Sequence, residues 1–514
     1  MNWEVRPKGR LTSSSNPPAS YPIEVETVKR YIATYFEQVH PMYPFLQRQE
    51  FEQKALDIRC SQLCKENAPF SALYHTVLAL GCQHQGGEFF QRNVSPSWEL
   101  FQVAWGIFPE IITSKETLTH VQAITAMAIF ARNTSYVQIE KVLTVEGARI
   151  AQSIGINRAI YAEGEMHLCQ RAFWVVYILE KTQTFACGRD SILVDSNIGT
   201  PIPHIAEAVF GGFDYFRAMC CFSRVLSKAN DSLFSITATL IPSITITATI
   251  NSLNGELERW KESIGEEFRP GTVLQQSGSL NSLSVAVKIR LSYHYYSAVI
   301  ALARLKLSVT SRETNTSKLP REQVLLHASR SIVEFTRYID VETYTPIWYL
   351  LSVPLSAIFI LFDFVIHNPR HPETNTNISL LGIAAGYFCR LELSSGGWFP
   401  TSLLSDLAHI ARDYTSGLDT RATEEPMVFS STAYSRQPDE DEAIAQPGLP
   451  ASVEESLPAA HDPIHGGAAN DPFYFPTDGD LFTIDGKFSE GVDLTSLFAA
   501  ELPDFLDPSI VDLS

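Results

Sequence analysis

The chain has 514 residues, enough for a large buried core and two or three structural units. Its 45% hydrophobic content is ordinary for a globular protein, but its net charge of −18 is unevenly spread, because residues 417–514 hold 20 Asp and Glu and only three Lys and Arg. A near-neutral body with an acidic end attracts phosphate weakly, which argues against nucleic-acid binding through bulk charge. The eight cysteines lack the regular spacing of a disulfide framework and indicate reduced, intracellular thiols.

The first part of the chain predicts a disordered start followed by helices. Residues 1–20 are rich in Ser, Pro and Asn, lack the apolar core of a signal peptide, and are predicted to be disordered. Apolar residues then recur at three- and four-residue steps from Val25 to Val39, and this helix should end at His40-Pro41, because a residue before proline avoids the helical region. The next predicted helices cover 47–58, 71–83, 119–132, 139–154 and 169–184.

Two details sharpen these predictions. Gly155 directly follows the helix over 139–154, where a left-handed cap is needed, and Ile156 can pack back against that helix. The segment 236–250 alternates Ile with Thr as a strand would, but its surroundings favour a helix.

The later part of the body also has a helical pattern. The apolar run 347–362 is shorter than the roughly 20 residues that span a bilayer and contains Pro354, so we expect a buried helix and no membrane partner. Residues 21–416 are therefore predicted to form an all-α, multi-helix body. Its later helices are expected at 255–264, 284–307, 322–339, 347–366, 379–393 and 402–413.

The body contains an ordered set of motifs, centred on Arg171-Ala-Phe-Trp174, Gly188-Arg189 and Pro201-Ile-Pro203. Together these motifs resemble the fungal-specific transcription factor domain, the middle regulatory region of fungal zinc-cluster regulators. Its central block comprises Arg171, Phe173, Trp174, Gly188, Arg189 and Pro203, and the block departs from the family pattern at Gln170, at Glu180-Lys181 and at Asp190. The flanking motifs that also match are Tyr35–Leu46 with Phe51, Ala148–Arg158, Leu257–Trp260 and Tyr293–Tyr296. The resemblance implies an all-α regulatory domain over about 21–416 in a divergent family member.

The residues of the central block favour a structural role. Phe173, Trp174 and Tyr177 have helical spacing and are expected to pack in the core. Arg171 and Arg189 are expected to form internal ion pairs with Asp195, Glu180 or helix ends, in preference to binding a ligand. No residue in the sequence identifies an effector pocket.

Residues 417–514 are predicted to be an acidic, mostly disordered tail with an activation segment. Acidic residues alternate there with clusters of Phe and Leu, a composition typical of segments that dock as short helices into coactivator grooves. A solvated tail without function is the alternative. The candidate coactivator-binding residues are Phe473, Phe475, Phe482, Leu494, Leu497, Phe498, Leu502, Phe505 and Leu506.

No catalytic or metal-binding motif is recognisable. An all-α prenyl-chain enzyme needs two acidic clusters around one cavity to hold Mg²⁺, and the dense cluster here, Asp439–Glu442, lies in the tail. Cys60 and Cys64 form a lone pair, whereas the family's six-cysteine DNA-binding module holds two zinc ions through paired cysteines. We therefore expect no enzyme activity and no cofactor, with zinc bound only if a missing N-terminal cluster exists.

The resemblance implies a nuclear regulator of a metabolic gene set, with a secondary-metabolite cluster as one such set. Two explanations for the missing DNA-binding module remain open. Its exon is lost from the gene prediction, or the chain reaches DNA indirectly through a DNA-binding homologue or as a homodimer. The expected partners are thus transcription coactivators and such a relative, and the alternative function is a DNA-independent coregulator or inhibitor of a full-length zinc-cluster relative.

Overall fold

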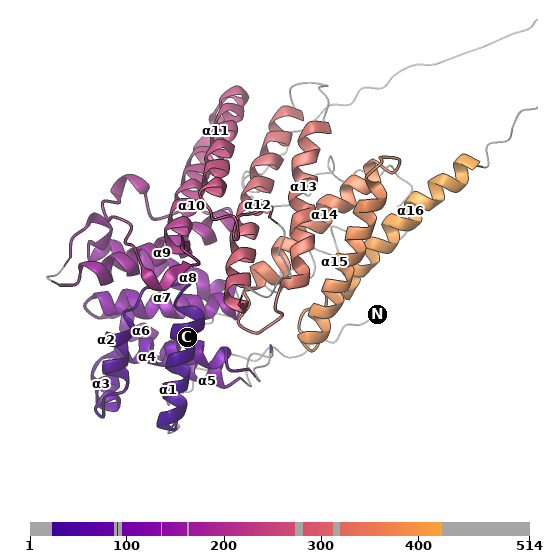
Figure 1. The fold of residues 1–514 in the computed structure, drawn as a ribbon. Helices are drawn as coiled ribbons and strands as arrows, with labels where there is room; N and C mark the ends of the chain where they lie inside the picture. Colours follow the sequence, from indigo (N-terminus) through magenta and orange to yellow (C-terminus); the bar gives the residue numbers. More distant parts are fainter. Residues whose placement is uncertain are drawn as a thin grey trace, which may run out of the picture.

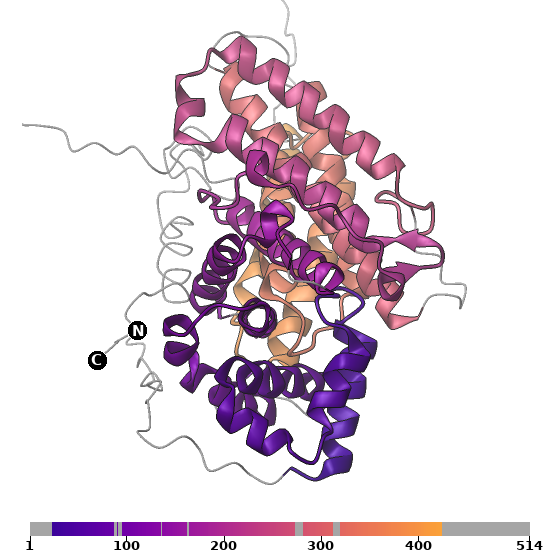
Figure 2. The same cartoon turned by 90° about the vertical axis from the view of Figure 1, so that its left-hand side faces the viewer.

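The computed structural model describes residues 23–86, 90, 95–134, 136–161, 164–272, 281–311 and 319–423. Within them the chain is almost entirely helical, as predicted, and consecutive helices pack on one another (Figure 1). Figure 2 shows the N-terminal helices at one end of the body and the helices from about residue 215 to 311 at the other, with the C-terminal helices behind them.

The N-terminal part is built around two buried helices, α4 (Ala68–Gln83) and α7 (Leu118–Asn133). α4 packs against α7 and against α1 (Val25–Thr34), whose last turns continue as a π-helix over Tyr35–Val39. The other helices of this part are α2 (Arg48–Ala55), α3 (Cys60–Glu66), α5 (Pro96–Gly106), α6 (Phe108–Thr113) and α8 (Val137–Ser153), followed by a 3-10 turn over Ile156–Arg158.

The middle of the chain connects the two ends of the body. α9 (Met166–Ala186) packs against α7, α8 and α10 (Tyr215–Ala229), and short 3-10 turns cover Asp195–Asn197 and Ala206–Ala208. A small antiparallel hairpin pairs β1 (Val209–Phe210) with β2 (Phe213–Asp214). After α10 come a π-helix over Asn230–Phe234, a 3-10 helix over Ile236–Leu240 and α11 (Ser243–Glu262), so the Ile/Thr-rich segment is helical as predicted.

The C-terminal part is a row of helices in which each packs on the next. These are α12 (Ser282–Ser311), α13 (Leu319–Phe335), α14 (Val353–His367), α15 (Thr374–Ser394) and α16 (Asp406–Thr423), with 3-10 turns over Thr336–Tyr338 and Ser402–Ser405. α16 continues to Thr423, so the helical body extends past Gly417, where the sequence pattern predicted that the tail begins.

The most apolar helix of the described residues is part of the core. A π-helix over Trp348–Ser352 leads directly into α14, and together they form the one described segment that is long and apolar enough to cross a membrane, with a mean hydropathy of 2.2. Most of it, 78%, is buried inside the fold. This agrees with the predicted buried helix.

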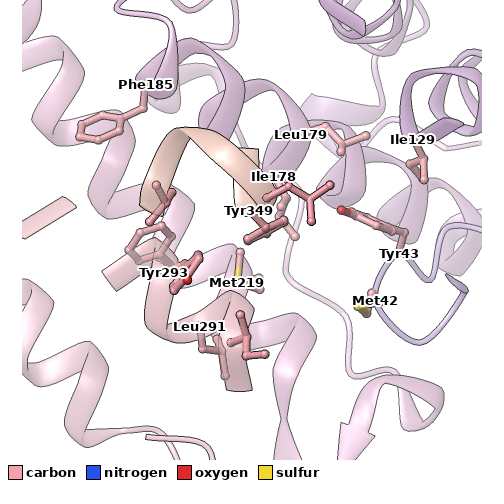
Figure 3. Close-up of a cluster of buried hydrophobic side chains, with 14 of the residues drawn as sticks. Met42, Tyr43, Ile129, Ile178, Leu179, Phe185, Met219, Leu291, Tyr293 and Tyr349 are labelled. Atoms are coloured by element: carbon pink, nitrogen blue, oxygen red, sulfur yellow. The ribbon is translucent and has the colours of Figure 1, made fainter. Parts of the chain in front are cut away.

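The main core lies where α7, α9, α10 and α12 converge with the turn after α1. Figure 3 shows side chains from all five segments in one cluster, with Ile129, Ile178, Met219 and Leu291 among them. Tyr43 enters the cluster from the turn, and its hydroxyl group points toward Ile178 and Tyr349.

Candidate functional site

The aromatic residues of the central block lie in the core, as the sequence predicted. Phe173, Trp174 and Tyr177 are fully buried on α9, and the Trp174 ring meets the Tyr177 ring edge to face at 5.0 Å. The indole Nε1–H of Trp174 donates a hydrogen bond of 2.9 Å to the carbonyl oxygen of Pro201. This bond fixes the Pro201–Pro203 segment against α9, so these two parts of the block form one structural unit.

Arg171 forms an ion pair, as predicted, but its partner is neither of the two carboxylates named from the sequence. Its guanidinium contacts the carboxylate of Glu207 at 3.2 Å and donates a 3.0 Å hydrogen bond to the carbonyl oxygen of Leu46. Neither Asp195 nor Glu180 takes part. Arg171 therefore ties α9 to the turn before α2 and to the 3-10 turn that contains Glu207.

The other three residues of the central block, Gly188, Arg189 and Pro203, lie outside the buried aromatic cluster on α9. Gly188 follows α9 with a φ of 57°, a left-handed conformation that glycine adopts at little cost. Arg189 is exposed and makes no ion pair with any residue that the structure describes, which corrects its predicted pairing. Pro203 is half-buried beyond the Trp174 contact.

The ion-pair scaffold expected in the block is built on Lys181 instead. This lysine is 2% exposed, and its Nζ lies 3.9 Å from Glu180 and 4.0 Å from Asp195. It donates hydrogen bonds to Ser191 Oγ at 2.6 Å and to the Leu193 carbonyl oxygen. Burial raises the pKa of Glu180, and the charge of Lys181 opposes that rise. A lysine at a position where the family pattern has arginine thus anchors the loop after α9.

His40, in the turn after α1, gives the fold a predicted sensitivity to acid. The ring is buried, its Nε2 bonds the carbonyl oxygen of Leu46 at 2.9 Å, and the guanidinium of Arg171 bonds the same oxygen. Burial lowers the pKa of His40 to about 4, and the charges of Arg171 and Arg48 act in the same direction, whereas Glu207 opposes them.

Because the folded protein keeps His40 neutral, its contribution to stability is complete above pH 6.5 and is lost as the pH falls toward 4. We expect His40 alone to reduce the free energy of unfolding by about 2 kcal/mol between pH 7 and pH 5. The variant His40→Gln keeps a hydrogen-bond donor for the Leu46 carbonyl oxygen but has no group that gains a proton in this range. Between pH 7 and pH 5 its free energy of unfolding, measured by urea titration, should therefore fall by about 2 kcal/mol less than that of the wild type. If the variant and the wild type lost the same free energy of unfolding between pH 7 and pH 5, His40 would not be the source of the acid sensitivity.

A cavity of about 90 Å³ opens at the junction between the N-terminal and C-terminal parts. Its apolar walls include Val39, Met42 and Ile289, and its polar lining includes Tyr43, Asn133 and Arg290. The walls come from the turn after α1, the end of α4, the end of α7, the start of α12 and the segment 338–349. Side chains more than 240 positions apart in sequence therefore meet here, as Arg290 and Tyr43 do.

The electrostatics of this cavity are dominated by Arg290. Its guanidinium donates a 2.8 Å hydrogen bond to the hydroxyl of Tyr43 and lies 5.1 Å from the Tyr349 ring centre. Burial raises the pKa of Tyr43, but the charges of Arg290 and Arg132 outweigh it and the net pKa is lowered. Burial and the Arg290 charge lower the pKa of His84 to about 4, so this imidazole is neutral at pH 7.

This cavity was not predicted from the sequence. The available signal was an arginine between Ile289 and Leu291 in a predicted apolar helix, where a charge needs a partner. Among the described residues, no group of three or more His, Cys, Asp and Glu side chains could hold a metal ion. The candidate coactivator-binding residues 473–506 lie outside the described residues.

Comparison with known proteins agrees with the resemblance noted in the sequence. Residues 32–262 match the fungal specific transcription factor domain, which covers α1 to α11 but not α12–α16. The chain is similar to an ABC-transporter-regulating transcription factor of Aspergillus oryzae, with 24% identity over 70% of this chain and 43% of that protein. It thus spans less than half the length of that relative.

Two further relatives are also named as regulators. The fusaridione A cluster transcription factor of Fusarium heterosporum is 25% identical over 72% of this chain and 74% of that protein. A negative regulator of pleiotropic drug resistance from Candida glabrata is 24% identical over 35% of this chain and 20% of that protein. These names indicate transcription regulators and not enzymes. Residues 32–262 of this chain therefore match the fungal specific transcription factor domain, and the relatives that the chain resembles are named as transcription regulators.

Proposed function

We propose that this chain activates a metabolic gene set in the nucleus, with a secondary-metabolite cluster as the first candidate, and that the acidic tail recruits the coactivator. The observation that carries the proposal is the division of charge. The chain joins a near-neutral domain of a regulator family to an end of 98 residues with 20 acidic and three basic residues. The name of the Fusarium relative supports a secondary-metabolite cluster, because that protein is a cluster transcription factor.

The proposed activation mechanism uses the physics of amphipathic segments. Repulsion among carboxylates keeps Phe498, Phe505 and their neighbours in solution, where they can insert into an apolar groove on a coactivator. The helical body needs no cofactor in this scheme. Access to DNA comes through a zinc-cluster module or through a DNA-binding homologue, and a homodimer is a further proposed assembly.

Fusing residues 470–514 to an unrelated DNA-binding domain tests the role of the tail. We expect reporter expression to rise about tenfold or more, and the double substitution Phe498→Ala and Phe505→Ala to remove most of the gain, because aromatic anchors dominate such interfaces. The matched control replaces Ser489 and Ser496, which leaves the charge and the aromatic residues unchanged. No gain in the fusion, or a gain that survives loss of both Phe residues, would contradict the proposal.

A second function is favoured by the relative from Candida glabrata, which is named a negative regulator. The chain would then act as a DNA-independent coregulator that captures a full-length zinc-cluster relative through the helical body. Chromatin immunoprecipitation of the chain with and without that relative separates the two functions. The coregulator function is supported if the chain no longer occupies promoters when the relative is absent, and if transcripts of the target genes increase when this chain is deleted.

A further inference from the structure

We propose that the cavity at the junction of the two parts binds a small organic carboxylate, with the carboxylate on Arg290 and a hydroxyl or amine group of the ligand facing Asn133. Both residues line the same cavity. The proposal extends beyond the regulatory function, because it assigns the body a ligand of defined chemistry.

The first reason is the missing counterion of Arg290. Among the residues that the structure describes, no carboxylate lies within ion-pair distance of its guanidinium, and its close neighbours are the tyrosines 43, 215 and 349. Arg132, the neighbouring cation, is neutralised by Glu140 at 2.7 Å. Arg290 is half-buried, and arginine keeps its charge in proteins, so a guanidinium partly withdrawn from water is stabilised by a partner. A bound anion would supply it, and the planar guanidinium suits a carboxylate held by two parallel hydrogen bonds.

The second reason is an unsatisfied buried acceptor. Asn133 is 4% exposed, and its Oδ1 has no hydrogen-bond partner in the described part of the chain. Buried polar groups in proteins almost always have partners, so an orphaned oxygen in a cavity wall indicates a donor supplied from the cavity. A hydroxyl or amine on the ligand would satisfy it.

Size and charge narrow the ligand class. About 90 Å³ is less than the 150 Å³ or so of an apolar cavity that accepts benzene, which limits the ligand to a few non-hydrogen atoms. An exposed carboxylate, Asp340, lines the mouth of the cavity. His84 is neutral, for the reason given above. One half-buried cation beneath an acidic mouth favours a monoanion over a dianion.

The cavity lies between two parts of the fold, so a bound ligand contacts both of them. Tyr43 and Asn133 belong to the matched domain over residues 32–262, whereas Arg290 and Tyr349 come from the helices that follow it. A ligand held by both sides stabilises their association, and any difference in affinity between two arrangements shifts the population between them.

Thermal unfolding and calorimetric titration of the full chain test the proposal. The probes are acetate, glycolate and glyoxylate at 10 mM, with the neutral amides of the same acids and inorganic phosphate as comparisons. We expect at least one acid to raise the Tm by about 2–4 °C, while its amide does not. Arg290→Gln should weaken binding about tenfold or more, and Arg290→Lys should weaken it less.

Two further variants make the result specific. Asn133→Ala should weaken binding of glycolate more than that of acetate, because the hydroxyl group of glycolate donates to Oδ1 and acetate has no such group. Arg217→Gln removes an exposed arginine on α10 and should bind like the wild type. The proposal fails if none of the acids raises the Tm or if the shift persists in Arg290→Gln. An equal shift with phosphate would also overturn it, because the carboxylate would then not be what is recognised.

Discussion

Trp174→Ala is expected to lower the free energy of unfolding by about 3–5 kcal/mol, the largest effect of any single substitution in the central block. The indole is fully buried and packs against Phe173 and Tyr177 at ring distances of 5.5 and 5.0 Å. The guanidinium of Arg224 lies 5.0 Å above it. Truncation leaves a cavity of indole size and leaves the Pro201 carbonyl oxygen without its donor. Urea denaturation followed by circular dichroism measures the loss.

Two controls separate the ring from its hydrogen bond. Trp174→Phe keeps most of the buried ring but removes the Nε1–H donor, so it should cost about 1–2 kcal/mol. Trp105→Ala removes a half-buried ring on α5 and should cost less than Trp174→Ala. If Trp174→Ala were no more destabilising than Trp105→Ala, the central block would not be the structural unit described above.

Gly81→Ala is the second substitution with a large expected effect, a loss of about 3 kcal/mol or more. An added Cβ would lie 2.0 Å from the carbonyl oxygen of Tyr31 and 2.7 Å from its carbonyl carbon. Both are backbone atoms of α1, so they cannot rotate away as a side chain would. α1 and α4 pack this closely because residue 81 has no side chain. Equilibrium denaturation of the variant measures the cost.

The matched control is Gly255→Ala on α11. A Cβ there meets no atom within 4 Å, and alanine is the better helix former, so the variant should gain about 0.5–1 kcal/mol. We therefore expect the free energy of unfolding to decrease in Gly81→Ala and to increase in Gly255→Ala. If Gly81→Ala and Gly255→Ala had similar free energies of unfolding, α1 and α4 would not approach each other as closely as described.

The fold was predictable where helical periodicity is long and clear. The helices predicted at 139–154 and 169–184 correspond to α8 and α9, and Gly155 adopts the expected left-handed conformation with a φ of 80°. Four described helices, α3, α5, α6 and α10, lie outside the predicted ranges. α3 has seven residues and no buried side chain, so it leaves no apolar pattern in the sequence. α5 and α6 are short and each begins with a proline in its first turn, which interrupts the pattern. α10 is strongly amphipathic, so its periodicity was present in the sequence and was overlooked.

The site was predictable only where its geometry is local. Phe173, Trp174 and Tyr177 lie three and four residues apart, so their shared burial follows from helical geometry. Arg171 and Arg290 find partners 36 and 247 positions away, which depend on how distant helices pack and cannot be deduced from spacing. The cavity belongs to this second kind, since its walls converge from five separate segments, one of which contributes His84.

Chromatin immunoprecipitation of the tagged full chain in its own fungus, with sequencing of the recovered DNA, tests the central claim of transcription regulation most directly. We predict enrichment at a discrete set of promoters, directly or through a DNA-binding relative, and reduced transcripts from those genes when the chain is deleted. Absence of the chain from all promoters, with target-gene transcripts unchanged on its deletion, would contradict the account.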